Sequence, residues 1–160
     1  NIPELSKIVR TQEIGVPARI KIQKLKIDAI VEQVGIASDG SMDVPSFPYN
    51  TAWYKLGARP GEKGSAVIDG HVNWKDGTKA VFSELHSLKP GDKIVVEDIN
   101  GALTTFIVRE SRTYASNAET RNIFTSTDGK AHLNLITCKG IWDKSSQEYS
   151  QRLVVFSDKE

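Results

Sequence analysis

The sequence predicts an all-β domain, either a barrel or a sandwich, made of many short strands with turns between them. Apolar and polar residues alternate over short runs, and turn signals such as Asp39-Gly40 and Asn100-Gly101 separate these runs. Segments with a helical pattern are few and short. A length of 160 residues suits one domain with its own core, and closure into a barrel would hide the sheet edges.

The alternation of apolar residues gives the expected elements in order. It begins at Ile20 and slips once around Gln23-Lys24, which indicates two strands or one strand with a bulge. Further strands are predicted at Met42–Pro45, Ser65–Val72, Lys93–Asp98, Leu103–Ser111, His132–Cys138 and Leu153–Phe156. Short helices are expected at Asn50–Leu56, at Ala80–Leu88 and in part of Ala118–Phe124. Long connections are expected at 116–131 and 139–151, on both sides of the strand that ends at Cys138.

Composition excludes several classes of partner. The 21 basic and 20 acidic residues are dispersed along the chain and give a net charge of +1, so nucleic acid is a poor candidate. No apolar run approaches the roughly 18 residues of a membrane span. Residues 1–17 lack periodicity, and we expect them to form an exposed N-terminal extension that leads from an anchor missing from this sequence.

The chain contains a single cysteine, Cys138, at the end of an apolar run. A lone cysteine forms no internal disulfide, so it is either a buried packing thiol or a nucleophile, and composition alone favours packing. Strand alternation places Leu133, Leu135 and Thr137 on one face and Cys138 on the other. If the leucines face the core, Cys138 faces outward at a strand end, which favours a reactive thiol.

A nucleophilic thiol needs a base or a cationic neighbour, and its reaction needs a group that stabilises an oxyanion. His71 ends a strand directly after Gly70, whereas His86 is interpreted as a surface residue and His132 as too distant along the cysteine strand. Arg152 opens the last strand and offers a fixed fork of donors. Taken alone, a single His is usually structural and a single Arg usually forms a surface ion pair.

Four segments together resemble the sortase family, the cysteine transpeptidases of Gram-positive surfaces. They are SAVIDGHV, AVFSELHSLKPGDKIVVED, LNLITC and RLVV, and the resemblance runs from about Ala18 to Phe156. It implies a closed eight-stranded sortase-type β-barrel with a few short helices, in a catalytic domain of residues 18–160. It also implies a site, with catalytic His71, Cys138 and Arg152 and substrate-binding Thr137, Ile136 and Trp142.

The resemblance also implies a reaction. The thiol would attack an LPXTG-like sorting motif after its Thr, form a thioacyl-enzyme, and transfer the protein to a cell-wall amine at the extracellular face of the membrane. The 116–131 connection would form one wall of the substrate groove. No metal and no cofactor are expected. The GHV-Asn73-Trp74 sequence is similar to class F or class D-like sortases, although those groups often carry Asp where Asn73 stands.

Two other functions compete with this one. A catalytically silent β-barrel for binding or adhesion could keep the same fold, but all three catalytic positions hold the expected residue types. A peptidoglycan transpeptidase of the L,D type usually carries its cysteine in a Ser-His-Gly-Cys context, which Ile136-Thr137-Cys138 does not match.

Overall fold

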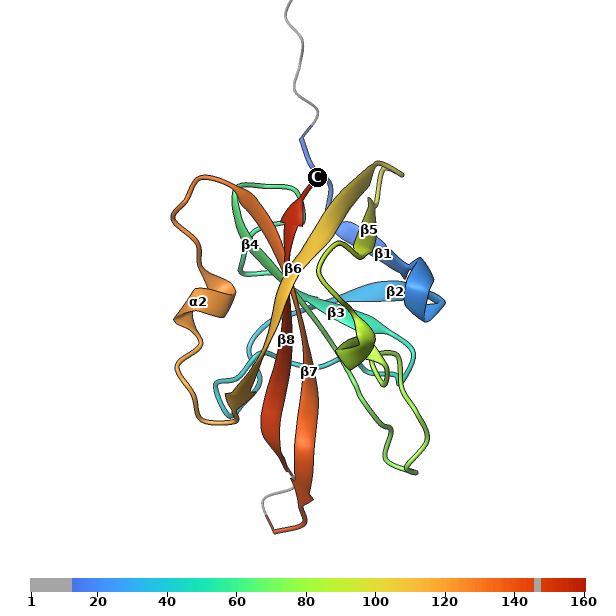
Figure 1. Ribbon diagram of the computed structural model, residues 1–160, viewed down its shortest axis with the longest axis vertical. Coiled ribbons are helices and arrows are strands. Elements are labelled where there is room, and N and C mark those ends of the chain that lie inside the picture. Colours follow the sequence, from blue (N-terminus) through green and yellow to red (C-terminus); the bar gives the residue numbers. More distant parts are fainter. Residues whose placement is uncertain (1–12, 146–147) are drawn as a thin grey trace, which may run out of the picture.

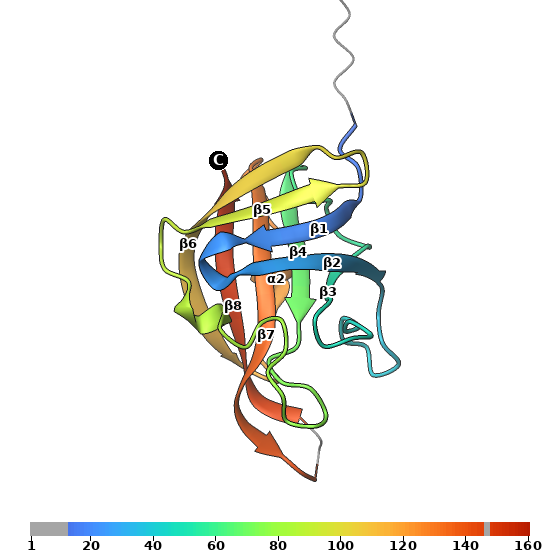
Figure 2. The same ribbon diagram turned by 90° about the vertical axis from the view of Figure 1, so that its right-hand side faces the viewer.

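The protein folds as a closed β-barrel of eight strands in the residues that the computed structural model describes, which are 13–145 and 148–160. The strands follow one another around the barrel in the order β1-β2-β3-β4-β7-β8-β6-β5 (Figures 1 and 2). Their bounds are β1 Pro17–Ile22, β2 Ile27–Val34, β3 Thr51–Tyr54, β4 Gly64–Gly70, β5 Lys93–Asp98, β6 Leu103–Ala115, β7 Ala131–Asp143 and β8 Glu148–Lys159. The prediction of an all-β closed eight-stranded barrel is confirmed.

Most of the predicted strands are present. One alternative that the sequence left open is settled, and three other local predictions need correction. The slip near Gln23 separates two strands, because the 3-10 helix η1 (Gln23–Leu25) lies between β1 and β2. The helix expected at 50–56 is instead the strand β3, and the strand expected at 42–45 is reduced to an isolated bridge between Ile36 and Met42. The long loop expected at 139–151 is largely a continuation of β7 and β8 as a hairpin past the end of the barrel (Figures 1 and 2).

Two of the three predicted helices are present in part, each as a short helical piece. The 3-10 helix η2 (Leu85–Ser87) is the helical part of 80–88, and α2 (Arg121–Phe124) is the helical part of 118–124. Both bury one apolar side chain, Leu85 and Ile123 respectively. Among the described residues, no helix has the length and apolar character needed to cross a membrane.

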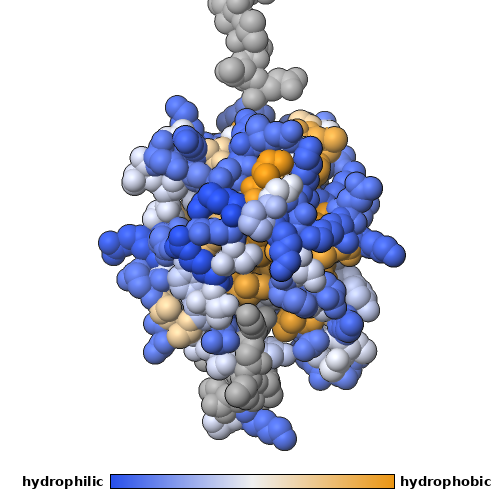
Figure 3. Space-filling model, viewed as in Figure 1, coloured by the Kyte–Doolittle hydropathy of each residue, from blue (hydrophilic) through white to orange (hydrophobic). Residues whose placement is uncertain are grey.

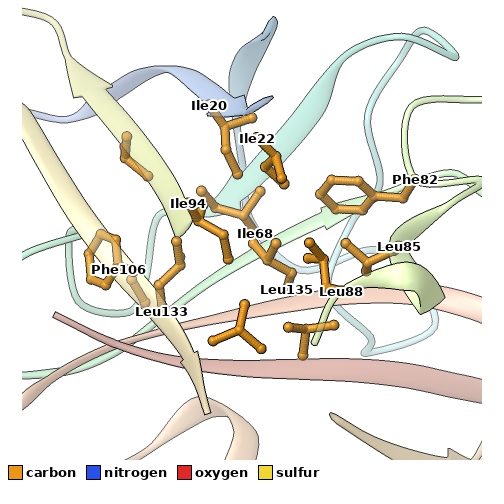
Figure 4. Close-up of a cluster of buried hydrophobic side chains, with 14 of the residues drawn as sticks. Ile20, Ile22, Ile68, Phe82, Leu85, Leu88, Ile94, Phe106, Leu133 and Leu135 are labelled. Atoms are coloured by element: carbon orange, nitrogen blue, oxygen red, sulfur yellow. The ribbon is translucent and has the colours of Figure 1, made fainter. Parts of the chain in front are cut away.

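The barrel interior is filled by aliphatic and aromatic side chains from all the strands. Leu133 and Leu135 of β7 are fully buried there, as the alternation in that strand predicts (Figure 4). A second, smaller cluster lies outside the barrel wall, where Ile123 of α2 packs on Val67, Val154 and Phe156. The helix therefore covers the outer face of β4 and β8, while the face seen in Figure 3 is mostly hydrophilic with separate apolar patches.

The first described residues lie against the barrel. The Gly15 N–H donates a hydrogen bond of 3.0 Å to the Asp98 carboxylate, and Arg59 donates one of 2.6 Å to the carbonyl of Ile14. The prediction of an exposed extension falls largely on residues 1–12, which lie outside the described residues.

The parallel pairing of β4 with β7 matters most for the site. Asp69 pairs with Ile136 in this ladder, so the end of β4 lies beside the middle of β7, which is far from it in sequence. On its other side β7 pairs with β8 in antiparallel fashion, and Cys138 is the partner of Arg152. Residues at the end of β4, near the end of the barrel part of β7 and in β8 are thus brought together.

His132 lies between two carboxylates at the opposite end of β7. Its Nδ1 is 2.7 Å from Asp158 and its Nε2 is 2.7 Å from Asp128. The Lys130 N–H and the His132 ring lower the pKa of Asp128 from 3.8 to about 2. This histidine therefore fastens the start of β7 to β8 and to the preceding turn.

We expect the Asp128→Asn variant to have a melting temperature a few degrees below that of the wild type at pH 6. Because the folded-state pKa is below the unfolded value, the contribution of Asp128 to stability is present above pH 3.8 and is lost as the pH falls through about 2. The difference between variant and wild type should therefore shrink on acidification, which thermal melts from pH 2 to 7 would measure. Asp28→Asn is the control, since Asp28 forms only an exposed ion pair with Arg19.

Candidate active site

A groove of about 430 Å³ lies on the outside of the barrel over the end of β4 and the middle of β7 and β8. Its floor comes from these three strands. One wall is the β2–β3 connection around residues 36–44, and the other is the 114–124 segment that contains α2. Four of the residues named from the sequence line it, namely His71, Ile136, Thr137 and Arg152.

His71 is the first residue after β4, and it is half-buried. Its Nε2 lies 2.8 Å from the carbonyl oxygen of Pro45, and its ring makes an edge contact of 5.4 Å between centroids with Trp74. Because a carbonyl oxygen only accepts, Nε2 carries the proton in this contact. In the neutral ring Nδ1 is then the basic nitrogen, so the β2–β3 connection fixes both the position and the tautomer of the imidazole.

The residue before His71 has to be glycine for steric reasons. A Cβ on Gly70 would lie 2.7 Å from Cδ2 of Phe82 and 2.8 Å from Cγ1 of Val81. Phe82 is a fully buried core residue that has no room to move away. The close approach at Gly70, rather than a flexible entry, therefore sets the path of the chain into His71.

Thr137 and Ile136 have different environments within the groove. The Thr137 hydroxyl is buried and donates a hydrogen bond of 2.8 Å to the carbonyl of Gly70, so it ties β7 to β4 just before His71. Ile136 is half-buried on the floor. Thr137 thus holds the end of β4 against β7, and Ile136 offers apolar contact area to a ligand.

Arg152 stands opposite Cys138 across the β7–β8 ladder. The guanidinium Nη1 donates to the carbonyls of Tyr149 and Gln151 at 3.2 and 3.3 Å, and the side chain is half-buried at the groove. These two contacts involve only one of its nitrogens. The side chains of residues 138–143, which include the Cys138 thiol and the predicted substrate residue Trp142, lie outside the described part of the structure.

The other two histidines lie elsewhere. His86 is on the surface, where its Nε2 is 3.7 Å from Glu84, and its side chain is 61% exposed. His132 is held between the two carboxylates described above. Neither of them lines the groove.

The groove also contains a carboxyl group that was not among the predicted site residues. Asp69 of β4 is buried, and its Oδ1 has no hydrogen-bond partner. Burial is the main cause that raises the pKa of Asp69 well above its ordinary value, and the charges of Asp43 and Glu32 raise it further. The signal available in the sequence was strand alternation, which puts Asp69 and His71 on one face.

An imidazole, a guanidinium and a cysteine position at one edge of a closed barrel are the parts needed for acyl transfer through a thiol. The sequence matches the model of the Sortase domain over residues 20–160. The chain therefore belongs to the sortase family, whose members are transpeptidases. No curated protein matches the chain in sequence.

Solved sortase structures share this fold at low sequence identity. Sortase C1 of Streptococcus agalactiae, in a complex with MTSET, is 20% identical with a TM-score of 0.69, over 89% of this chain and 66% of that one. Sortase A of Corynebacterium diphtheriae is 20% identical with a TM-score of 0.69, over 100% of this chain and 69% of that one. A Clostridium perfringens sortase D5 transpeptidase is 17% identical with a TM-score of 0.67, over 100% and 89%. This chain thus spans just under two thirds of the first of these structures.

Proposed function

We propose that this protein is a cysteine transpeptidase that cleaves an LPXTG-like sorting motif after its Thr and transfers the acyl group to a cell-wall amine. His71 first takes the proton of the Cys138 thiol; the thiolate attacks the Thr carbonyl, and the C–N bond breaks to leave a thioester. The leaving amine takes a proton from His71. The incoming amine then gives a proton back to His71 as it attacks the thioester, so the enzyme returns to its starting state.

The single observation that carries this proposal is that His71 and Arg152 line one groove beside the backbone of Cys138. His71 and Arg152 line the groove, and the backbone of Cys138 pairs with that of Arg152 in the β7–β8 ladder. In this proposal the free donors of the Arg152 guanidinium stabilise the oxyanion that forms on the Thr carbonyl. The silent binding module is disfavoured, because a purely binding groove has no need for this set of groups.

The walls of the groove suit an extended peptide with apolar residues. Met42 and Val44 come from one wall, and Ile123 and Phe124 from the other. Ile123 is buried, whereas Met42 and Phe124 are half-buried and Val44 is exposed, and these three provide contact area for the Leu and Pro of a sorting motif. Within the family we assign the chain to the class F or class D-like groups, and we place its substrate proteins and amine acceptor at the cell surface.

The test is to incubate the protein with a panel of LPXTG-like peptides, with and without a glycine or diaminopimelate-type amine. Mass spectrometry of the intact protein should show a thioester at Cys138, and the amine should convert it into a transpeptidation product. The Cys138→Ala variant should form neither while keeping the circular dichroism spectrum and melting temperature of the wild type. A folded wild-type sample that forms no thioester with any peptide would contradict the proposed function. Unfolding of Cys138→Ala would instead identify the thiol as a packing residue.

A further inference from the structure

Asp69 is the one ionisable side chain of the groove floor that has a buried oxygen without a partner. The residue is 9% exposed, and its Oδ1 makes no hydrogen bond. The other such atom among the described residues, Oδ1 of Asn134, lies outside the groove, and the amide nitrogen of Asn134 already donates to Ile123. A buried polar group without a partner is costly for the folded state, unless a ligand supplies that partner.

The strand register places Asp69 two residues along the strands from the proposed catalytic groups. Asp69 pairs with Ile136 in β7, and Ile136 pairs with Val154 in β8. Two residues further along β7 and β8, Cys138 pairs with Arg152, and His71 follows Asp69 by two residues. Two residues along a strand span roughly 6.5 Å and neighbouring strands lie about 4.8 Å apart, so the backbones of Asp69 and Cys138 are about 8 Å apart. A peptide residue whose carbonyl lies at the Cys138–Arg152 pair therefore has its side chain within reach of Asp69.

The surroundings of Asp69 favour a ligand rather than His71 as its missing partner. The Nε2 of His71 already contacts the carbonyl of Pro45 at 2.8 Å. The floor neighbours Ile136 and Val154 offer no polar side-chain atom. Burial, with the charges of Asp43 and Glu32, favours the protonated carboxyl, which can both donate and accept a hydrogen bond. A hydroxyl group, which also does both, is the matching partner.

We propose that Asp69 is a specificity-determining residue, whose carboxyl hydrogen-bonds the side-chain hydroxyl of the substrate residue that carries the scissile carbonyl. The inference rests on the proposed function, because it takes the sorting peptide as the ligand. This hydrogen bond selects a Thr or Ser at that position of the substrate over an apolar residue of the same shape. Val in place of Thr leaves the buried carboxyl without a partner, and this loss is the source of discrimination.

A double-mutant cycle between enzyme and peptide tests this pairing. The peptides are a pair with Thr or Val before the scissile bond, and the enzymes are the wild type, Asp69→Asn and Asp69→Leu. We expect the wild type to acylate on the Thr peptide with a kcat/KM roughly 10- to 100-fold higher than on the Val peptide. Asp69→Leu should reduce this preference to about threefold or less, and Asp69→Asn, which keeps a donor and an acceptor, should retain most of it.

The matched control is Ser65→Ala, a buried residue on the same face of β4 that does not line the groove. It should leave the Thr preference as in the wild type. If Asp69→Leu lowers kcat/KM by the same factor on both peptides, Asp69 serves to position His71 and the inference is overturned. An unchanged preference in Asp69→Leu would also overturn it.

A binding measurement separates this inference from the proposed function. In the Cys138→Ala background, titration followed by NMR should show tighter binding of the Thr peptide than of the Val peptide, and Asp69→Leu should remove the difference. If this binding preference is found but the wild type forms no thioester, the proposed reaction is wrong and the Asp69 inference stands. If thioester forms equally fast from both peptides, the reaction stands and the Asp69 inference is wrong.

Discussion

Replacement of His71 by Ala is expected to lower the rate of transpeptidation by about 10²- to 10⁴-fold, the usual loss when a general acid–base group is removed. In the proposed reaction the imidazole protonates the leaving amine and deprotonates the incoming one, so both halves of the reaction lose their proton carrier. The measurement is kcat/KM for transfer of an LPXTG-like peptide to a glycine-type amine, followed by chromatography of the product.

His86→Ala is the matched control, because His86 is an exposed histidine outside the groove. It should keep the activity of the wild type. Equal loss in both variants would indicate an effect on folding, which their melting temperatures would reveal. A His71→Ala enzyme with a rate near that of the wild type would remove His71 from the mechanism.

Arg152→Lys should lower kcat/KM by about 10²- to 10³-fold, as does the loss of one donor to an oxyanion. The guanidinium of Arg152 already uses Nη1 on the carbonyls of Tyr149 and Gln151. Its planar fork can keep those contacts and still direct other N–H groups at the substrate, which a single ammonium on a flexible stem cannot do. Rate measurements at saturating and at limiting peptide concentration would show whether the loss lies in kcat, as oxyanion stabilisation requires.

The control for this charge-conserving change is Arg19→Lys, at an exposed ion pair with Asp28 far along the chain from the groove. Its activity should equal that of the wild type. If Arg152→Lys raises only KM, the guanidinium binds the substrate without stabilising the transition state, and its proposed role would have to be changed.

Strand alternation was enough to predict much of the barrel, because most strands bury one face. Leu133 and Leu135 are in the core, as their alternation predicts. The pairing of Cys138 with Arg152 comes from the register of β7 and β8, which was not predicted. The strand β3 was missed for a physical reason. It has four residues, of which Thr51, Ala52 and Trp53 are all buried, so it lacks alternation and depends on partners in β2 and β4.

The extension of β7 and β8 past the barrel could not be predicted in the same way. The sequence at 139–151 has many polar residues and no regular alternation of apolar ones, so its pattern resembles that of a loop. Strand alternation puts the groove residue Asp69 on the same face as His71, but it does not predict that Asp69 is buried. Its burial comes from the two walls, which fold over the floor from residues distant in sequence. The pattern of residues next to Asp69 in the sequence does not show that distant segments will bury it.

The position of β8 in the barrel has a consequence for the order in which the protein is made. This strand lies between β7 and β6 and supplies Arg152, so it both completes the sheet and carries a residue of the proposed catalytic set. A ribosome releases it after every other strand. The growing chain therefore carries His71 and Cys138 without a finished groove, and Arg152 joins them only when β8 has been made.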